Sequence, residues 1–156
     1  MRYALMSTPV GPLTLGSTDK GLALVHFGNS VPRDGIVDEA ANGPYMGQLR
    51  EYFHGKRTCF DFPLDVEGTP FQMAVWRELR KIPYGHTRSY GDIAKSLGKP
   101  GAARAVGMAN HNNPIAIVVP CHRVIGHDGS LTGYGGGLHL KQKLLSLEQQ
   151  TQTLFT

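Results

Sequence analysis

The residue types most capable of chemistry lie together at positions 120–124, where the sequence reads Pro-Cys-His-Arg-Val. Cys121 carries a sulfur nucleophile, and His122 and Arg123 place a base and a cation directly beside it. A free thiol is only slightly ionised near neutral pH, so a cysteine that reacts needs a base, a cation or a hydrogen-bond network nearby. The motif therefore predicts that Cys121 is an activated nucleophile.

A structural cysteine is the alternative interpretation of Cys121, since a buried cysteine often acts as a small apolar side chain. The apolar run at 115–119 directly precedes the motif and is consistent with a buried strand that ends at the cysteine. A Cys-His pair alone is compatible with either interpretation. The sequence around it distinguishes the two.

Composition indicates a globular protein, with 156 residues of which 40% are hydrophobic. No segment approaches the roughly 18 continuous apolar residues that a membrane span needs, and no signal-peptide core follows Met1. We therefore expect a cytoplasmic protein that does not bind membranes. Cys59 and Cys121 do not form a regular framework, and a reducing compartment would keep both as thiols.

Charge is unevenly distributed along the chain. Residues 1–80 contain eight Lys and Arg against nine Asp and Glu, whereas residues 81–156 contain eight against three. A basic second half favours a polyanionic partner, because affinity for nucleic acid comes largely from phosphate neutralisation. A solvated basic surface without a partner is the alternative.

The first part of the chain predicts a small α/β domain over residues 1–65. A helical pattern covers 44–54, and Gly55 is placed to end that helix. Alternating apolar residues between turn-forming Pro, Gly and Asp predict a β-meander, with strands at 3–7, 13–17, 22–27 and 59–64. A short linker at 65–68 then separates this domain from the rest.

Residues 69–156 predict a second, mainly helical domain. Thr69, Pro70 and Gln72 form a capping-box start for a helix that continues to about residue 81. On that helix Trp76 is expected in the core rather than as a platform for a stacked base. The apolar residues that define its buried face are Phe71, Ala74, Val75 and Leu79.

Two short helices follow with helix-turn-helix spacing. Ser89 caps the first, at 90–97, residues 98–100 turn the chain, and the second runs over about 101–110. The spacing alone is a weak signal, because many helix pairs have a glycine in the turn. The second helix is rich in small residues, and Arg104 stands out among them.

Further short motifs surround the reactive cysteine between residues 69 and 148. They are FQMAVW at 71–76, IPYG at 82–85, Ser89-Tyr90, AARAVG at 102–107, Asn113-Pro114, PCHRV at 120–124 and GYGGGL at 133–138. Together they resemble the O6-alkylguanine-DNA alkyltransferases, also called methylated-DNA–protein-cysteine methyltransferases. The first 60 or so residues match this family only in length and rough pattern.

The resemblance implies DNA repair in a single-turnover reaction. The protein would flip O6-alkylguanine, and by extension O4-alkylthymine, out of duplex DNA and transfer the alkyl group to Cys121. A thioether has no easy leaving group, so each molecule would react once. The implied partner is double-stranded DNA with little sequence preference, bound by a monomer without a cofactor and associated with the nucleoid while on DNA.

The same resemblance implies roles around the sulfur. His122 would accept the thiol proton through a bound water, and Glu148 would orient His122. Tyr90 would donate to the departing guanine. A solvated carboxylate at the end of a helix over 138–147 is the alternative for Glu148.

On the DNA side, the resemblance implies that the second helix enters the minor groove. Arg104 would then fill the gap that the flipped guanine leaves in the base stack. An ordinary exposed arginine is the alternative. The other residues expected at DNA are Ala103, Ala105, Gly107, Ser89 and Arg123.

The substrate pocket is expected to include a glycine-rich loop. Tyr134, Gly135 and Gly136 would cover the base, with bare backbone amides able to reach O6. Backbone carbonyls of Cys121 and Val124 would contact the guanine amino group. Asn113 would bond backbone groups of the turn that holds the cysteine.

Three other readings of the sequence are considered. A damage sensor would flip the base without transfer, but relatives of that kind lack the nucleophile. A cysteine hydrolase has no use for a basic helix-turn-helix. A metal site is not expected, because Cys121, His122 and His127 are too close and too few for zinc, and His26, His54 and Cys59 are too few in the first domain.

Gly135 generates a prediction about alkyl-group size. Some members of the family carry serine after the tyrosine, where this chain has glycine. We predict a roomier or less polar O6 side and therefore tolerance of larger alkyl groups. Alkyl-transfer rates on O6-methyl- and O6-benzylguanine test this, and outright rejection of the benzyl group would contradict it.

Overall fold

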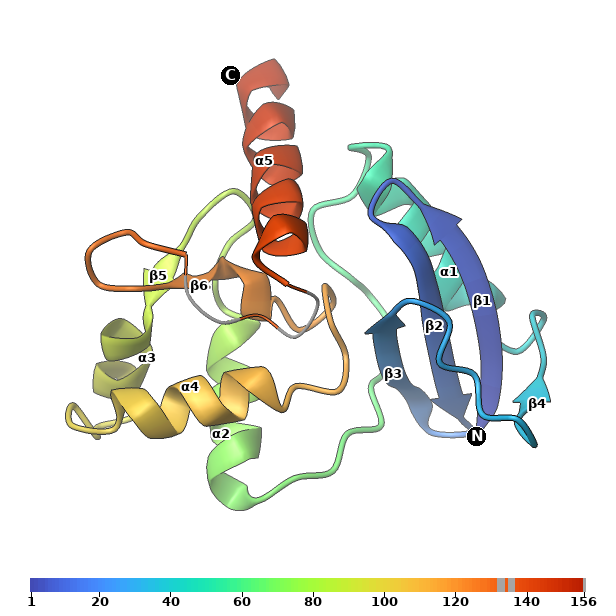
Figure 1. Ribbon diagram of the computed structural model, residues 1–156, viewed down its shortest axis with the longest axis horizontal. Helices are drawn as coiled ribbons and strands as arrows, with labels where there is room; N and C mark the ends of the chain where they lie inside the picture. The colour runs from blue at the N-terminus through green and yellow to red at the C-terminus, as the bar shows by residue number, and fades with distance from the viewer. Residues whose placement is uncertain (132–133, 135–136, 156) are drawn as a thin grey trace. The chain divides into compact units, whose positions relative to one another are not determined.

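The computed structural model describes residues 1–131, 134 and 137–155, with side chains up to residue 150. The chain folds into two compact units (Figure 1). Unit 1 comprises Met1–Val66 and Pro114–Ala116, and unit 2 comprises Glu67–Asn113 and Ile117–Thr156. The predicted fold class, a sheet-containing first part and a mainly helical second part, is confirmed.

Unit 1 is a four-stranded sheet with one helix against it (Figure 1). Its elements are β1 (Arg2–Thr8), β2 (Gly11–Thr18), β3 (Gly21–Phe27), β4 (Ile36–Val37) and α1 (Gly43–Phe53). The strand order is β3-β2-β1-β4, with β4 parallel to β1 and the other pairs antiparallel. Alternation along the strands buries residues such as Ala4, Met6 and Leu15, and α1 contributes Leu49 and Tyr52 to the core.

The segment predicted as a strand at 59–64 is largely irregular. Only an isolated parallel bridge joins Leu64 to Leu22, flanked by bonds from Leu22 N to Pro63 O and from Asp65 N to Leu22 O. Pro63 has no N–H to donate, so the segment cannot continue a ladder. The sequence analysis also missed β4, because two residues are too short for a periodic signal.

The apolar run at 115–119 forms a turn rather than the expected strand. Val25 N donates to Pro114 O at 3.0 Å and Ala116 N to Val25 O at 3.1 Å, so the start of the run is bonded to β3 of unit 1. Ile117 then takes a positive φ of 73°, which is strained for a β-branched residue. The run is buried, as its composition suggested, but a reversal of the chain precedes the cysteine.

The described residues of unit 2 form four α-helices and a short parallel ladder of two strands. They are α2 (Pro70–Leu79), α3 (Tyr90–Ser96), α4 (Ala103–His111), α5 (Leu138–Phe155), β5 (Arg88–Ser89) and β6 (Val124–Ile125), with a 3-10 turn, η1 (Cys121–Arg123). Both predicted caps are present: Thr69 and Gln72 cap α2 reciprocally, and Ser89 does the same with Asp92 for α3. No helix within the described residues is long and apolar enough to cross a bilayer.

Trp76 joins α2 to α4 in the core of unit 2, where Figure 1 shows the two helices crossing. Its side chain is 5% exposed, and Nε1 donates to Ala109 O at 2.8 Å. This confirms Trp76 as a core residue. The bond fixes α4, the helix that carries Arg104, on its buried side.

Replacing Trp76 should therefore weaken unit 2. Trp76→Phe keeps an aromatic ring but leaves the buried Ala109 carbonyl without its donor, which should lower the free energy of unfolding by about 1–3 kcal/mol. Trp76→Ala also creates a cavity and should lower it by about 3–5 kcal/mol. Urea unfolding followed by circular dichroism measures both, and an unchanged midpoint for Trp76→Phe would contradict the assignment.

Candidate active site

Cys121 begins η1 and is 6% exposed. Its N–H donates to Val119 O at 2.8 Å, and its carbonyl accepts from Asn110 Nδ2 of α4 at 3.3 Å. Burial raises the pKa of the thiol, and hydrogen bonds with the Asn113 and Tyr134 side chains only partly oppose this. The resting sulfur is therefore protonated, so attack requires a base.

His122, the adjacent base, is fully buried and bound to Glu148. The distance from His122 Nε2 to Glu148 Oε2 is 2.7 Å. Burial alone would raise the pKa of Glu148, but His122 and Arg123 outweigh it and lower the pKa to about 2. Glu148 is thus ionised at neutral pH and can only accept hydrogen bonds.

The ionised carboxylate determines the tautomer of His122. Burial lowers the pKa of His122 despite the opposing charge of Glu148, so the imidazole is neutral at neutral pH. Since Nε2 faces an acceptor, Nε2 carries the proton and Nδ1 keeps its lone pair. Nδ1 is buried and has no hydrogen-bond partner in the described part of the chain. The residue that follows Cys121 therefore keeps one proton-accepting ring nitrogen.

Arg123 is not where the sequence led us to expect it. The residue is 6% exposed; Nε donates to Glu148 Oε1 at 2.8 Å and a terminal nitrogen to Oε2 at 3.0 Å. The other terminal nitrogen donates to Ile82 O at 2.8 Å. These nitrogen atoms donate to groups inside unit 2. Arg123 therefore positions Glu148 and does not have the DNA contact that we expected. A charge of this kind is buried only when it is paired.

Tyr90 is brought to the reactive segment by the β5–β6 ladder. Arg88 pairs with Val124 and Ser89 with Ile125, so Tyr90 follows directly after the paired residues. A Cβ added at Gly107 of α4 would lie 3.9 Å from the Tyr90 ring, which places the ring against that helix. Segments more than 30 residues apart are thereby assembled around Cys121.

Lys141 is a buried cation that the sequence analysis missed. Its side chain on α5 donates to Val124 O at 2.5 Å, and its Nζ lies 6.0 Å from the centre of the Tyr90 ring. Burial lowers the pKa of Lys141, and its charge in turn lowers that of Cys121. Lys141, Leu144 and Glu148 are spaced by three and four residues and are all buried. This spacing places the three residues on one face of α5, and it was the sequence signal that Lys141 could be buried.

The remaining pocket residues divide into two groups. Asn113 Nδ2 donates to Val119 O at 2.9 Å, as expected for a residue that holds the turn, and its side chain also bonds the Cys121 thiol. Burial and the neighbouring thiol raise the pKa of Tyr134 well above its usual value. Gly135 and Gly136 lie outside the described residues.

The residues expected at DNA are mostly on α4. Arg104 and Ala105 are exposed, and Ala103 and Gly107 are half-buried. The Ser89 hydroxyl instead accepts from Asp92 N at 3.0 Å as the cap of α3. Next to it is a hollow of about 450 Å³ whose lining includes Arg88, Lys95 and His127.

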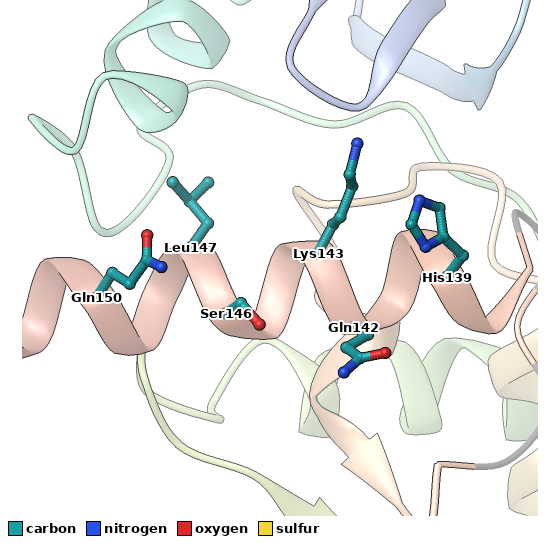
Figure 2. Close-up of a pocket in the computed structure, with 6 residues that line it drawn as sticks. All are labelled: His139, Gln142, Lys143, Ser146, Leu147 and Gln150. Carbon is teal, nitrogen blue, oxygen red and sulfur yellow. The ribbon is translucent and has the colours of Figure 1, made fainter.

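A second hollow, of about 400 Å³, lies along α5 (Figure 2). Figure 2 shows Lys143 and Leu147 pointing to the same side of the helix and Gln142 to the other. None of the expected site residues lines it. Within the described residues, no three His, Cys, Asp or Glu side chains gather in a way that could hold a metal ion.

Comparisons with known proteins place both parts of the chain in one family. Residues 70–150 match the DNA-binding domain of 6-O-methylguanine DNA methyltransferase, and residues 1–66 match its ribonuclease-like domain. Methylated-DNA–protein-cysteine methyltransferases are similar over nearly their full lengths. That of Methanosarcina acetivorans is 49% identical (95% of this chain, 98% of the relative), and that of Mycolicibacterium paratuberculosis is 52% identical (96% and 93%). The solved structure of Mycobacterium tuberculosis OGT in complex with DNA superposes with a TM-score of 0.91 at 48% identity, covering 100% of both chains.

Lys141 generates a prediction about the pH dependence of the thiol. Lys141→Met removes a positive charge that favours the thiolate, so the pKa of Cys121 should rise and its reaction at neutral pH should slow by about tenfold. The measurement is the rate of alkylation of Cys121 by a small uncharged reagent against pH, in a Cys59→Ser background. Lys143→Met removes the same charge from an exposed position of α5 and should leave the profile unchanged. Equal profiles for the two variants would contradict the role of Lys141.

Proposed function

Because the chain belongs to the 6-O-methylguanine DNA methyltransferase family, we propose that Cys121 is the residue that accepts the alkyl group. The activity is DNA repair by alkyl transfer from DNA to a cysteine of the protein. Cys121 is the buried cysteine, whereas Cys59 is exposed. The observation that carries the proposal is the buried Glu148–His122 pair, which leaves a basic ring nitrogen on the residue that follows Cys121.

The first step is loss of the thiol proton. His122 accepts it at Nδ1 through a water molecule, and the imidazolium that forms is stabilised by ionised Glu148. Arg123 holds both carboxylate oxygens of Glu148 and thereby positions it. The charge of Lys141 favours the thiolate further.

The second step is displacement at the alkyl carbon. The bond between that carbon and O6 of the base breaks as the bond to the Cys121 sulfur forms. Guanine leaves with negative charge on its O6 side and takes a proton from the Tyr90 hydroxyl. The proton that His122 took from the thiol is released to solvent, and Tyr90 takes one back from solvent. In sum, the base gains the hydrogen that the thiol loses. The thioether product has no easy leaving group, and each molecule is consumed.

The substrate class proposed is O6-alkylguanine, with O4-alkylthymine as a related lesion, in double-stranded DNA. The protein binds DNA, as the solved complex of the M. tuberculosis relative with DNA supports. Arg104 is exposed on α4 and is available to fill the gap left by a flipped base. Recognition by phosphate contacts gives little sequence preference.

We also propose that the chain acts as a monomer in the cytoplasm and is associated with the nucleoid when bound to DNA. The substrate is a base in chromosomal DNA, and one reactive cysteine per chain is sufficient for one transfer. Both cysteines are free thiols, as a reducing compartment requires.

Cys121→Ser tests the assignment of the nucleophile. The variant should bind a duplex oligonucleotide containing O6-methylguanine with wild-type affinity, because the sulfur is not needed for binding, but it should take up no alkyl group. Intact-protein mass spectrometry after incubation measures the uptake, and peptide mapping locates it. Cys59→Ser is the matched control and should gain one alkyl group like the wild type.

The same measurement separates other functions. A wild-type protein that binds the lesion but gains no mass would indicate a damage sensor. Unmodified protein with repeated turnover would indicate a hydrolase. Uptake that persists in Cys121→Ser would show that another residue is the nucleophile.

A further inference from the structure

Met108 projects from the outward face of α4 and is 63% exposed. It lies four residues after Arg104 and three before His111, and all three are exposed, so they share one face of the helix. A single exposed apolar residue is common on protein surfaces. Its surroundings therefore decide whether it has a role.

The surroundings of Met108 favour an anionic partner. The sequence contains no Asp or Glu between Asp92 and Asp128, a stretch that includes all of α4. It does contain Lys95, Lys99 and Arg104 before Met108. Such a stretch favours a polyanionic partner, because it contains no carboxylate of its own to offset its positive charges.

The shape of α4 also makes Met108 prominent. Ala105 on the exposed face ends at Cβ, and the half-buried positions nearest to it are Ala102, Ala103 and Gly107. A backbone or groove wall can approach such a surface closely, and Met108 would be the apolar side chain that meets it first. A thioether is flexible and polarizable, so it adapts to an irregular surface.

Duplex DNA offers both an anionic and an apolar surface to this face of α4. Its phosphates match the cations, and the sugar edges and base steps inside a groove are apolar. Proteins that bind the minor groove combine basic side chains with apolar ones, methionine among them, which press against or between base steps.

We propose that Met108 is a DNA contact that packs in the groove one helical turn from Arg104, against the sugar edges beside the displaced nucleotide, and supplies a salt-independent part of the affinity. The inference rests on the proposed function, because it requires α4 to face the duplex. It adds an apolar contact to a face on which the family resemblance assigned only an arginine and small residues.

The experiment measures affinity against salt in a Cys121→Ser background, so that no transfer consumes the complex. The probe is a fluorescent duplex with one O6-methylguanine, and anisotropy gives Kd over about 50–200 mM salt. Met108→Ala should raise Kd by about three- to tenfold at every salt concentration without changing the slope of log Kd against log salt. Arg104→Gln removes one positive charge from the same face of α4 and should lower that slope by about one.

Two further variants serve as controls. Met108→Leu keeps a large apolar side chain and should bind within about twofold of the parent. Ile36→Ala truncates a side chain that is 66% exposed in unit 1 and should leave Kd unchanged. Circular dichroism and melting temperature check that each variant is folded, which we expect because both truncated side chains are exposed.

The outcomes distinguish this inference from the function on which it rests. If Met108→Ala binds like the parent, or if its loss of affinity disappears at high salt, Met108 is not an apolar contact. If the parent itself shows no duplex binding and the wild type takes up no alkyl group, the proposed function fails and this inference fails with it. A salt-independent loss that Met108→Leu restores supports the contact.

Discussion

The hydrogen bond between His122 and buried, ionised Glu148 is the interaction on which the reactive site depends. The carboxylate can only accept, so it holds the imidazole in one tautomer and leaves the other nitrogen basic. A buried charge needs compensation, and Arg123 provides it with two hydrogen bonds of 2.8 and 3.0 Å. The hydrogen bond thus determines the orientation of the His122 ring and which of its two nitrogens carries the proton. The charges of Glu148 and Arg123 can be buried because each is the partner of the other.

Burial around Cys121 has two opposing effects. It raises the pKa of the thiol, which disfavours the thiolate in the resting protein. It also lowers the pKa of His122, which keeps the imidazole neutral and able to accept a proton. A resting cysteine that is protonated beside a neutral base is less exposed to unwanted oxidation and alkylation than a free thiolate. In the proposed mechanism the thiol is deprotonated only when His122 accepts its proton, and Lys141 and Glu148 stabilise the charges that appear.

Helix α4 connects the reactive turn to the proposed DNA-facing surface. On its inner side, Ala109 accepts from Trp76, and Asn110 donates to the Cys121 carbonyl. On its outer side, Arg104 and Met108 are exposed. Between these two sides α4 carries small side chains, and Gly107 leaves room for the Tyr90 ring at van der Waals distance. One nine-residue helix therefore contacts the core, the cysteine turn and the surface.

The sequence by itself determined the local features of this protein: the three long strands of the first unit, the caps of α2 and α3, the helix-turn-helix spacing, Trp76 in the core and the Cys-His motif. These depend on periodicity, turn chemistry and adjacent residues, which a linear pattern contains. Only the tertiary structure decided that the apolar run before the cysteine turns at Ile117, that Arg123 points inward to Glu148, and that Lys141 is buried beside Val124. These three features depend on contacts between residues that are distant in the sequence. A charge or carbonyl that is buried away from water needs a hydrogen-bond partner, and only the folded chain shows which distant residue supplies it.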